Sequence, residues 1–430
     1  MNTTSKFHKF YSWGRVSYSL SKKITLDRGK KLLPKTLIIG KSYSYGDCCQ
    51  NNLGNLYQFD QNKIIKFDKV KGLIVCQSGI TIKELHENTI PFGWMIPVSP
   101  GCENISLGGA VANDVHGKNF HVFSSFGNHI RSLVILKSNG KKYLCNRKKN
   151  SKLFKATIGG VGLTGMILEI EFQLRKINTI YTDSYSQTFS NINQYLKMSD
   201  KFDNDYEFSA AWVDFNKSSK GRGVIFGSNF SKQKYLPKKY VKKKFFDFPK
   251  LNINFVNNFS ASIFSKIYYW KHKLTSKKYM RNTIFDVLYP LDKIGNWNNI
   301  YGKNGFYQIQ VSCPKKLFVR LYEELSSEIS KFTMSPLVVI KIFNKHKSIG
   351  MLSFPVTGHI TIAIDIPNKN LNDNFFSTIE SIVEKNHGRF YLAKDNFMSK
   401  KFFYKSYKNI YDFLKYKDKN ISSSMFERIF

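Results

Sequence analysis

The stretch Gly108-Gly109-Ala110-Val111-Ala112-Asn113-Asp114-Val115-His116-Gly117-Lys118-Asn119-Phe120-His121 decides how the rest of the chain is organised. It has too little apolar volume to fill a core, but its small residues allow the backbone to approach a large, flat ligand closely. Two further glycine loops bracket it, at residues 40–47 and 159–165. Each loop alone is equally compatible with an ordinary tight turn. Three such loops within one domain predict a cofactor that lies along the chain surface.

Length and charge limit the classes of protein that fit. With 430 residues, 42% of them hydrophobic, the chain is long enough for two domains with real cores. The formal net charge of +37 is a feature of nucleic-acid-binding proteins. The basic residues are, however, scattered along the whole chain, which indicates a compositional bias. We therefore expect no nucleic-acid partner, whereas a basic surface favours anionic substrates or an anionic membrane face.

The six cysteines have no CxxC spacing, and Cys48 and Cys49 are adjacent, so free thiols in a reducing compartment are expected. The first 15 residues contain no apolar stretch of the kind found in signal peptides. No run of about 18 apolar residues, the length that spans a bilayer, is present. These features predict a cytoplasmic protein that is soluble or bound peripherally to the inner membrane face.

Periodicity and turn signals predict the elements of the first 176 residues. Short strands are expected at 35–39, 64–68, 72–78 and 166–174, and helices at 81–88, which opens with a capping box, and 151–157. A hairpin is expected at 130–145, because Asn139-Gly140 is a preferred two-residue turn.

The composition shifts after Lys176, and the elements expected beyond it suggest a second unit. Strands are predicted at 206–215, 223–230, 306–311, 337–343 and 359–366, with helices at 316–331 and 371–386, the latter ended by Gly388. This order predicts an α+β domain with an antiparallel sheet. Residues 232–277, rich in lysine and aromatics, are interpreted as a long and mobile surface excursion, and 407–416 as a helix.

Two motifs are tested for chemistry and set aside. Gly160-x-Gly162-x-x-Gly165 matches a dinucleotide fingerprint, but that motif needs a strand before it and a helix after it, and the expected order here is the reverse. His116, His121 and His129 lack the spacing of a metal site. His116 fits a hydrogen-bond partner of a bound cofactor or, equally, a structural histidine.

Two lysines stand out by their surroundings. Lys341 lies inside the apolar run 338–343, so its strand lies at a sheet edge or its side chain faces a polar pocket. Lys394 follows a short strand where the chain turns back towards its end, and a solvated surface lysine is the ordinary interpretation there.

Short motifs occur in a fixed order along most of the chain: Ser44-Tyr45-Gly46-Asp47, Pro100-Gly101, the central stretch, Gly127-Asn128-His129-x-Arg131-Ser132, Gly159-Gly160-x-Gly162-Leu163-Thr164-Gly165, Leu291-Asp292, Gly295-x-Trp297-Asn298, Gly305-Phe306-x-Gln308-x-Gln310, Lys341-x-Phe343, Ser353-Phe354-Pro355 and Ala393-Lys394-Asp395. This order resembles flavoproteins of the vanillyl-alcohol-oxidase type with a PCMH-type FAD domain. It is most similar to the decaprenylphosphoryl-β-D-ribose 2-oxidase family.

The resemblance implies a two-domain α+β flavoprotein with non-covalent FAD. The FAD domain would comprise residues 1–178 and a returning segment 389–430, and the substrate domain residues 179–388. The implied reaction transfers a hydride to flavin N5 and oxidises the 2-hydroxyl of a polyprenyl-phosphoryl pentose to a ketone. This would be the first half of an epimerisation, completed by a separate NAD(P)-dependent reductase.

The family motifs assign roles by position. The implied catalytic residues are Lys394, as the cation that stabilises negative charge, and His116, Tyr45 or a water as proton acceptor. The implied substrate-binding residues are Lys118, Gln308, Gln310, Lys341 and Tyr391. The loop at 42–47 would wrap the pyrophosphate with its N–H groups. The implied FAD-binding residues are Ser42, Tyr43, Ser44, Tyr45, Gly46, Asp47, Pro100, Gly101, Cys102, Gly108, Gly109, Ala112, Asn113, His116, Gly117, Asn119, Gly162 and Ile167.

The sequence departs from the family pattern at two places, and other functions stay open. Ser42 and Tyr43 replace the usual Gly and Arg of the pyrophosphate loop, and Ala363 replaces a cysteine of some members. An oxidase of soluble sugars, alditols or aldonolactones on the same fold is the alternative enzyme. A basic protein that binds nucleic acid or a membrane without catalysis is the alternative of another class.

Overall fold

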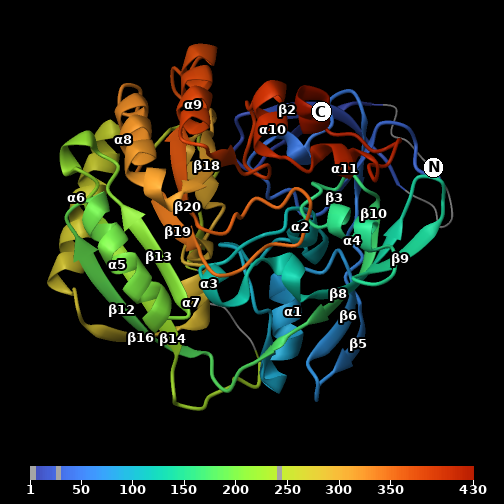
Figure 1. Cartoon of the computed structure of the whole chain (residues 1–430), viewed down its shortest axis with the longest axis horizontal. Helices are drawn as coiled ribbons and strands as arrows, with labels where there is room; N and C mark the ends of the chain where they lie inside the picture. Colours follow the sequence, from blue (N-terminus) through green and yellow to red (C-terminus); the bar gives the residue numbers. More distant parts are fainter. Residues whose placement is uncertain (1–5, 26–30, 240–244) are drawn as a thin grey trace.

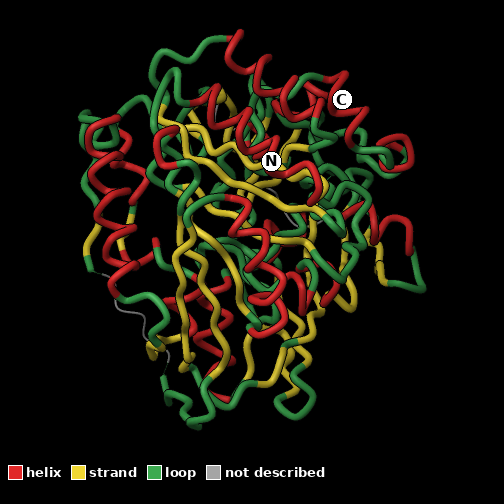
Figure 2. Tube along the Cα trace, turned by 60° about the vertical axis from the view of Figure 1, so that its left-hand side comes forward, coloured by secondary structure: helices red, strands yellow, loops and turns green. Residues whose placement is uncertain are grey.

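A computed structural model describes residues 6–25, 31–239 and 245–430 of the protein. The strands run through the middle of the molecule, as Figure 2 shows in yellow. Strands from the first 176 residues lie on one side together with the C-terminal helices, and strands from residue 181 onward lie towards the other side (Figure 1). The structure is a mixture of helices and antiparallel sheets, as the sequence predicts.

Two sheets are built from the first part of the chain. The larger is antiparallel with the order β5-β6-β10-β8-β9, and its strands are Ile64–Asp68, Leu73–Gln77, Met166–Gln173, Ile130–Leu136 and Lys142–Asn146. Its β8–β9 pair is the expected hairpin, in which Ser132 faces Asn146. The smaller sheet has the order β1-β2-β4-β3, formed by His8–Tyr11, Tyr18–Lys23, Asn55–Gln58 and Thr36–Ile39.

Short helices connect these strands and carry the central glycine stretch. Helix α1 (Ile82–Thr89) has the predicted capping box, because Thr81 and Glu84 each accept a backbone N–H from the other. Helix α2 (Leu107–Ala112) begins after Ser106 and covers the first part of the stretch. The other elements here are α3 (Phe120–Phe123), α4 (Ser151–Thr157) and the paired strands β7 (Trp94–Met95) and β11 (Arg175–Lys176).

An eight-stranded antiparallel sheet dominates the rest of the molecule. Its order is β16-β12-β14-β13-β19-β20-β18-β21, with the bounds Tyr279–Thr283, Tyr181–Phe189, Gly223–Phe230, Phe208–Val213, Val338–Phe343, His359–Pro367, Phe306–Pro314 and Arg389–Phe390. A small parallel pair joins β15 (Phe246–Asp247) to β17 (Ile294–Gly295). Short 3₁₀ helices lie at Asp47–Cys49, Ile90–Phe92, Phe126–His129, Lys217–Ser219, Leu291–Lys293, Trp297–Tyr301 and Lys315–Leu317.

The alternation of side chains along these strands gives the large sheet two different faces. One face packs against α5 (Ile192–Asp205), α8 (Phe318–Ile329) and α9 (Asp373–Lys385) in the largest apolar cluster of the protein. On the other face, α6 (Asn258–Leu274) packs against β12 and β14. Helix α7 (Ile284–Leu288) follows β16. The strands β18, β19 and β20 turn their polar residues to the same face as α6.

The C-terminal segment returns to the N-terminal strands. It contains α10 (Lys400–Ser406), α11 (Ile410–Leu414) and α12 (Ser424–Ile429). The N–H of Thr36 donates to the Asn420 carbonyl at 2.9 Å, and the N–H of Ser422 donates to the Thr36 carbonyl at 3.1 Å. These red helices lie beside the blue strands β2 and β3 in Figure 1.

Several sequence-based expectations are wrong in detail. The expected excursion at 232–277 contains the 17-residue helix α6, although residues 240–244 lie outside the described part of the chain. The helix expected at 407–416 shrinks to α11, and α10 and α12 were not predicted. The left-handed residue after α9 is His387, with a φ of 51°, and not Gly388. Gly388 is required instead by crowding, because an added Cβ would lie 2.8 Å from Val383.

Candidate active site

The site is built on the polar face of β18, β19 and β20. Ile309, Val311, Ile340, Ile342, Ile360, Ile362 and Ile364 point into the large core, so the residues between them point the other way. These include Gln308, Gln310, Lys341, Thr361 and Asp365. Strand β19 lies inside the sheet between β13 and β20. Lys341 is therefore not on an edge strand. Of the two predicted alternatives, the one that holds is a side chain that faces polar groups.

The central glycine stretch reaches this face just after α2. Asp114 fixes its path, since its carboxylate accepts the Gly127 N–H at 2.8 Å and the Ser353 hydroxyl at 2.5 Å. Asp114 itself has a φ of 40°, a conformation that this pair of bonds holds in place. The Asn119 amide donates to the Pro97 carbonyl at 2.8 Å. The loop between them brings His116 to the strands.

His116 lies buried among aromatic rings and touches β18. Its ring centroid is 5.1 Å from that of Phe343 and 5.3 Å from that of Tyr391. The Gln310 amide nitrogen lies 3.0 Å from His116 Nε2 and also donates to Thr361 Oγ1. Burial, with Lys341 and Lys394 nearby, lowers the pKa of His116 well below its usual range. The ring is therefore neutral, and because Nε2 accepts from Gln310 the proton resides on Nδ1.

Three partly buried lysines lie in this part of the site, and two of them, Lys341 and Lys394, act on His116. Burial and the charge of Lys341 lower the pKa of Lys118 to about 7, and burial lowers the pKa of Lys341 to about 8. Burial and Lys341 also lower the pKa of Lys394 to about 7, against the opposing effect of Asp365. The Lys118 ammonium donates to the Val287 carbonyl, and the Lys394 ammonium lies 5.3 Å from the ring centre of Tyr45. Lys394 is thus no ordinary surface lysine.

Asp365 is a site residue that the sequence reasoning missed. It is 1% exposed, accepts a hydrogen bond from the Gln308 amide and lies 3.4 Å from the Tyr301 hydroxyl. Burial raises the pKa of Asp365 to about 7, although Gln308 and Lys394 oppose the shift. The available signal was a carboxylate inside the apolar strand β20, the same signal that identified Lys341 in β19.

The loop at 42–47 is held from both sides. Trp13 stacks on Tyr43 with 4.3 Å between ring centroids, and the Trp13 N–H donates to the Ser44 carbonyl at 2.9 Å. The N–H groups of Tyr45, Gly46 and Asp47 donate to the carbonyls of residues 393 and 395. The expectation that the whole loop offers its N–H groups to a pyrophosphate is therefore wrong for these three residues.

The first half of that loop still fits a phosphate. Among the described residues, the N–H groups of Ser42, Tyr43 and Ser44 have no hydrogen-bond acceptor. Ser42 has a φ of 56°, a left-handed conformation of the kind found in loops whose N–H groups bind anions. These three consecutive donors form a suitable site for one phosphate group of a dinucleotide.

Other atoms of the site also fit a large polar cofactor. Four buried atoms of the site have no hydrogen-bond partner among the described residues: Asn113 Oδ1, His116 Nδ1, Asn119 Oδ1 and Gln308 Oε1. Leaving such groups unpaired is costly, so a ligand with matching donors and acceptors is expected. A Cβ added at Gly101 would meet no atom within 4 Å, and one at Gly162 would meet only the Ile38 carbonyl at 3.9 Å. The site therefore fits FAD, whose ring edge and phosphates carry such groups.

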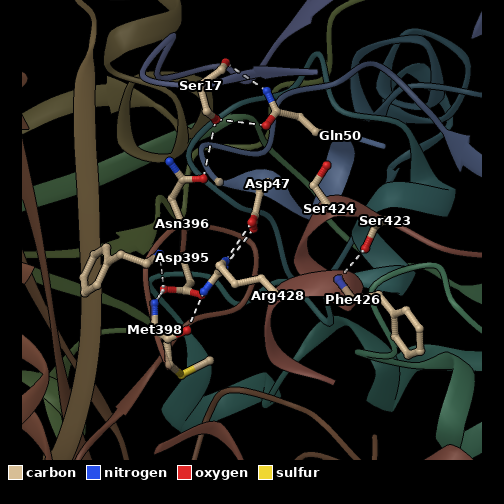
Figure 3. Close-up of polar contacts among 12 residues, drawn as sticks. Ser17, Asp47, Gln50, Asp395, Asn396, Met398, Ser423, Ser424, Phe426 and Arg428 are labelled. Carbon is tan, nitrogen blue, oxygen red and sulfur yellow. Dashed lines mark hydrogen bonds and ion pairs between the residues drawn. The ribbon is translucent and has the colours of Figure 1, made fainter. Parts of the chain in front are cut away.

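A buried arginine joins the loop to the Lys394 segment. The Arg428 guanidinium forms two bonds of 2.9 Å to Asp47 and one of 2.7 Å to Asp395, and it also donates to the Met398 carbonyl (Figure 3). The side chains of Asp395 and Asp47 are 0% and 9% exposed. Burial alone would lower the pKa of Arg428, but Asp395 and Asp47 raise it. No sequence signal identified Arg428.

The remaining predicted residues lie around this frame. The Tyr391 hydroxyl donates to the Asn113 carbonyl at 2.9 Å, which joins the C-terminal segment to the central stretch. Burial raises the pKa of the Tyr43 hydroxyl, and the nearby Cys102 raises it further. The Ala112 carbonyl accepts a hydrogen bond from the Val161 N–H. The Ile167 carbonyl accepts one from the Ser78 hydroxyl. No contact among the described residues joins Ile167 to the lysines, and its role stays a prediction.

Comparison with known proteins agrees with this geometry. Residues 35–146 match the family described as FAD binding domain. The chain is 31% identical over 390 residues to decaprenylphosphoryl-beta-D-ribose oxidase of Mycolicibacterium smegmatis, which covers 87% of this chain and 84% of the relative. It is 22% identical over 171 residues to L-gulonolactone oxidase of Scyliorhinus torazame, 38% of each chain. No helix in the described residues is long and apolar enough to cross a membrane.

The two glycines Gly101 and Gly46 give a matched pair of tests for the cofactor site. Gly101→Ala adds a methyl group to open space at a position without a left-handed backbone, so stability should change by less than about 0.5 kcal/mol. FAD affinity, measured by titration of the cofactor-free protein, should fall if the cofactor occupies that space. Gly46→Ala would clash with the Asp395 carbonyl and should cost about 1–3 kcal/mol. Unchanged FAD affinity in Gly101→Ala would contradict the placement.

Removal of the Arg428 guanidinium tests the buried cluster. Arg428→Met leaves Asp47 and Asp395 without their cation and should lower the free energy of unfolding by about 3–5 kcal/mol, measured by denaturant titration. Arg320→Met is the control, because Arg320 makes a half-exposed pair with Glu324 worth less than about 1 kcal/mol. A similar loss in both variants would show that the cluster has no special role.

Proposed function

The chain belongs to the decaprenylphosphoryl-β-D-ribose oxidase family, and we propose that it oxidises the 2-hydroxyl of a pentose joined through phosphate to a polyprenyl lipid. It is an FAD-dependent oxidoreductase that acts on CH–OH groups. The extent of the similarity supports the finer assignment, since it spans 87% of this chain for that relative and only 38% for L-gulonolactone oxidase. A match that continues beyond residues 35–146 also includes strands that carry residues proposed to bind the substrate.

The charge of the site is the structural observation that favours a phosphate-bearing substrate. Lys118, Lys341 and Lys394 lie together, and among the described residues Asp365 is the one carboxylate that acts on any of their pKa values. Buried cations are stable when they are paired, so an anionic ligand is expected beside them. A phosphate-linked sugar supplies that charge, whereas a free alditol or aldonolactone does not.

The residues of the chain divide the remaining tasks. FAD, when bound, would supply the acceptor for the hydride that leaves the carbon bearing the hydroxyl group. Lys394 holds a positive charge at a fixed place, which stabilises developing negative charge without reorganisation. Gln308 and Gln310 turn amide groups to the same face, where they orient the sugar hydroxyls. His116 donates through its Nδ1–H, and the buried ring cluster around it excludes water.

The hydroxyl proton needs an acceptor, and Asp365 is best suited to accept it. Burial raises the pKa of Tyr45 well above its usual value, so its phenol stays protonated and acts as a donor. The Nε2 of His116 already accepts from Gln310. A carboxylate with a pKa of about 7 is matched to proton transfer near neutral pH. In the proposed step the O–H and C–H bonds break, a C=O bond forms, and the proton passes to Asp365.

The proposed function includes a division into two domains, non-covalent FAD and a second enzyme that uses the product. Residues 1–178 and 389–430 form the FAD domain and 179–388 the substrate domain, supported by the bonds that tie Asn420 and Ser422 to Thr36. The FAD is held without a covalent bond. The ketone product is consumed by a separate NAD(P)-dependent reductase, which delivers hydride to the opposite face and completes an epimerisation.

Variants at Lys394 test its role as the fixed cation. Lys394→Ala should slow flavin reduction in single-turnover experiments by a factor of about 10²–10³, with FAD still bound. In the natural protein the rate should rise and then fall around pH 7, because Asp365 must lose its proton to act as the acceptor and Lys394 must keep its own. Lys394→Arg keeps its charge at every such pH and should lack this decline. If the flavin of Lys394→Ala is reduced at the natural rate, Lys394 is not the fixed cation, and Lys118 or Lys341 has that role.

Anaerobic bleaching of the flavin tests the substrate. A polyprenyl-phosphoryl ribose with a short, soluble chain should bleach the flavin rapidly, because its phosphate meets the lysine cluster. Free pentoses, alditols and aldonolactones should bleach it at least about 100-fold more slowly, the loss expected for one or two missing charge-assisted bonds. Rapid bleaching by a soluble sugar alone would assign the protein to the alternative, an oxidase of soluble sugars or lactones.

A further inference from the structure

Exposed apolar side chains are concentrated in one segment of the protein. Of 25 large hydrophobic residues that are exposed in the described chain, 13 lie between residues 245 and 280. The segment makes up less than a tenth of the sequence, so this share is far above an even distribution. Large contiguous apolar surfaces of this kind mark interaction sites. The 13 residues are Phe245, Phe246, Leu251, Ile253, Phe255, Phe259, Ile263, Phe264, Ile267, Trp270, Leu274, Tyr279 and Met280.

Helix α6 orders this surface. Phe259, Ile263, Ile267, Trp270 and Leu274 recur at spacings of three or four residues and therefore lie along one side of the helix. Their exposure ranges from 41% for Ile263 to 78% for Leu274. The opposite side, with Ala261, Ser265 and Tyr269, is buried. The helix has an apolar stripe on each side, and within the described part of the chain only the inner stripe packs against the rest of the protein.

The buried side of α6 fixes the helix firmly to the large sheet. Tyr268 packs against Trp212 with 4.7 Å between ring centroids, and His272 packs against Phe226 at 5.1 Å. The side chain of Asn257 caps the first turn, and Ser260 completes the capping box. The outer stripe is thus carried on a rigid element at the outside of the molecule, at the left in Figure 1.

The charges around the stripe favour an anionic surface. Residues 245–280 contain six lysines and a single acidic residue, Asp247. By helical spacing, Lys266 and Lys273 flank the stripe on one side and Lys271 flanks it on the other. A helix with an apolar stripe between lysines lies in the plane of a membrane interface, where the lysines contact anionic head groups.

The same segment leads to the active site. The N–H of Phe245 donates to the Lys293 carbonyl at 2.9 Å, and the N–H of Phe255 donates to the Ile300 carbonyl at 2.9 Å. Val256 then packs in an apolar cluster with Trp297, Tyr301 and Phe306, against which Tyr45 rests. Tyr301 in turn lies beside Asp365. An apolar path therefore runs from the exposed segment to the residues of the site.

We propose that residues 245–280 form a membrane-docking surface, in which the outer stripe of α6 lies in the head-group region of an anionic bilayer. Docking itself requires only this surface. That the docked protein draws its substrate from the bilayer rests on the proposed function. The lipid chain would lie against the exposed apolar side chains of this segment while the sugar phosphate reaches the lysines.

Vesicle binding by the full FAD-loaded protein tests the proposal. The protein should co-sediment with vesicles of phosphatidylglycerol and phosphatidylcholine, less with phosphatidylcholine alone, and less at high salt. Trp270 is the one exposed residue among the five tryptophans, so its fluorescence should shift to shorter wavelength on binding. The triple variant Phe259→Ser, Ile267→Ser, Leu274→Ser should bind at least about 100-fold more weakly, because three large apolar groups no longer enter the bilayer.

A matched variant separates this surface from general hydrophobicity. Leu53→Ser, Val70→Ser, Tyr411→Ser removes three side chains with similar exposure elsewhere and should bind vesicles like the natural protein. Both triple variants should oxidise a soluble short-chain substrate at the natural rate. Equal vesicle binding by both, or none by the natural protein, would overturn the docking surface. Concentration-dependent self-association that is lost in the α6 variant, without vesicle binding, would assign the stripe to a contact between copies of the chain.

The two proposals fail in different ways. Oxidation of the soluble lipid-linked sugar without vesicle binding would overturn the docking surface and leave the proposed function intact. Vesicle binding without oxidation of that sugar would overturn the proposed function and leave the docking surface intact.

Discussion

The Arg428 guanidinium holds together three segments that are distant in the sequence. Its partners Asp47 and Asp395 belong to the loop at 42–47 and to the segment that carries Lys394, and Arg428 itself lies on the last helix. Removing two carboxylates from water is compensated here by three short contacts to one planar cation, which also donates to the Met398 carbonyl. The loop at 42–47 and Lys394 therefore adopt these positions only when the last helix, α12, is packed against them.

The rest of the site follows from the alternation of the large sheet. Each strand that sends isoleucines into the core must send its other residues to the opposite face, so Gln310, Lys341 and Asp365 meet there without any special turn. Burial then lowers the pKa of each lysine and raises that of Asp365, because the charged forms lose their hydration. Groups that are fully ionised on a surface thus become groups that exchange protons near neutral pH.

The parts of this structure that were predicted correctly are those that local sequence determines. The capping box at Thr81, the hairpin around Asn139-Gly140 and the charged residue in an apolar strand at Lys341 each carry their signal within a few residues. Arg428 was missed because its partners lie more than 30 and 380 residues away. The strands β2 and β4 were missed because they pair in parallel between segments that are distant in the sequence, whereas β1 was missed although its antiparallel partner β2 is near. The family resemblance supplied Lys394, which periodicity alone would have left on the surface.

Helix α6 was missed for a reason that bears on its function. Amphipathic periodicity identifies a helix when one side is apolar and the other polar, but α6 has apolar residues on both sides and lysines between them. Such a pattern is expected of a helix that must satisfy two apolar environments, its own sheet and an external one. The inner side packs on the sheet face that also carries Lys341 and Gln310. A single sheet face thus carries a cationic site near β18–β20 and an apolar, lysine-flanked helix near β12–β14, the two chemistries that a sugar phosphate with a lipid tail presents.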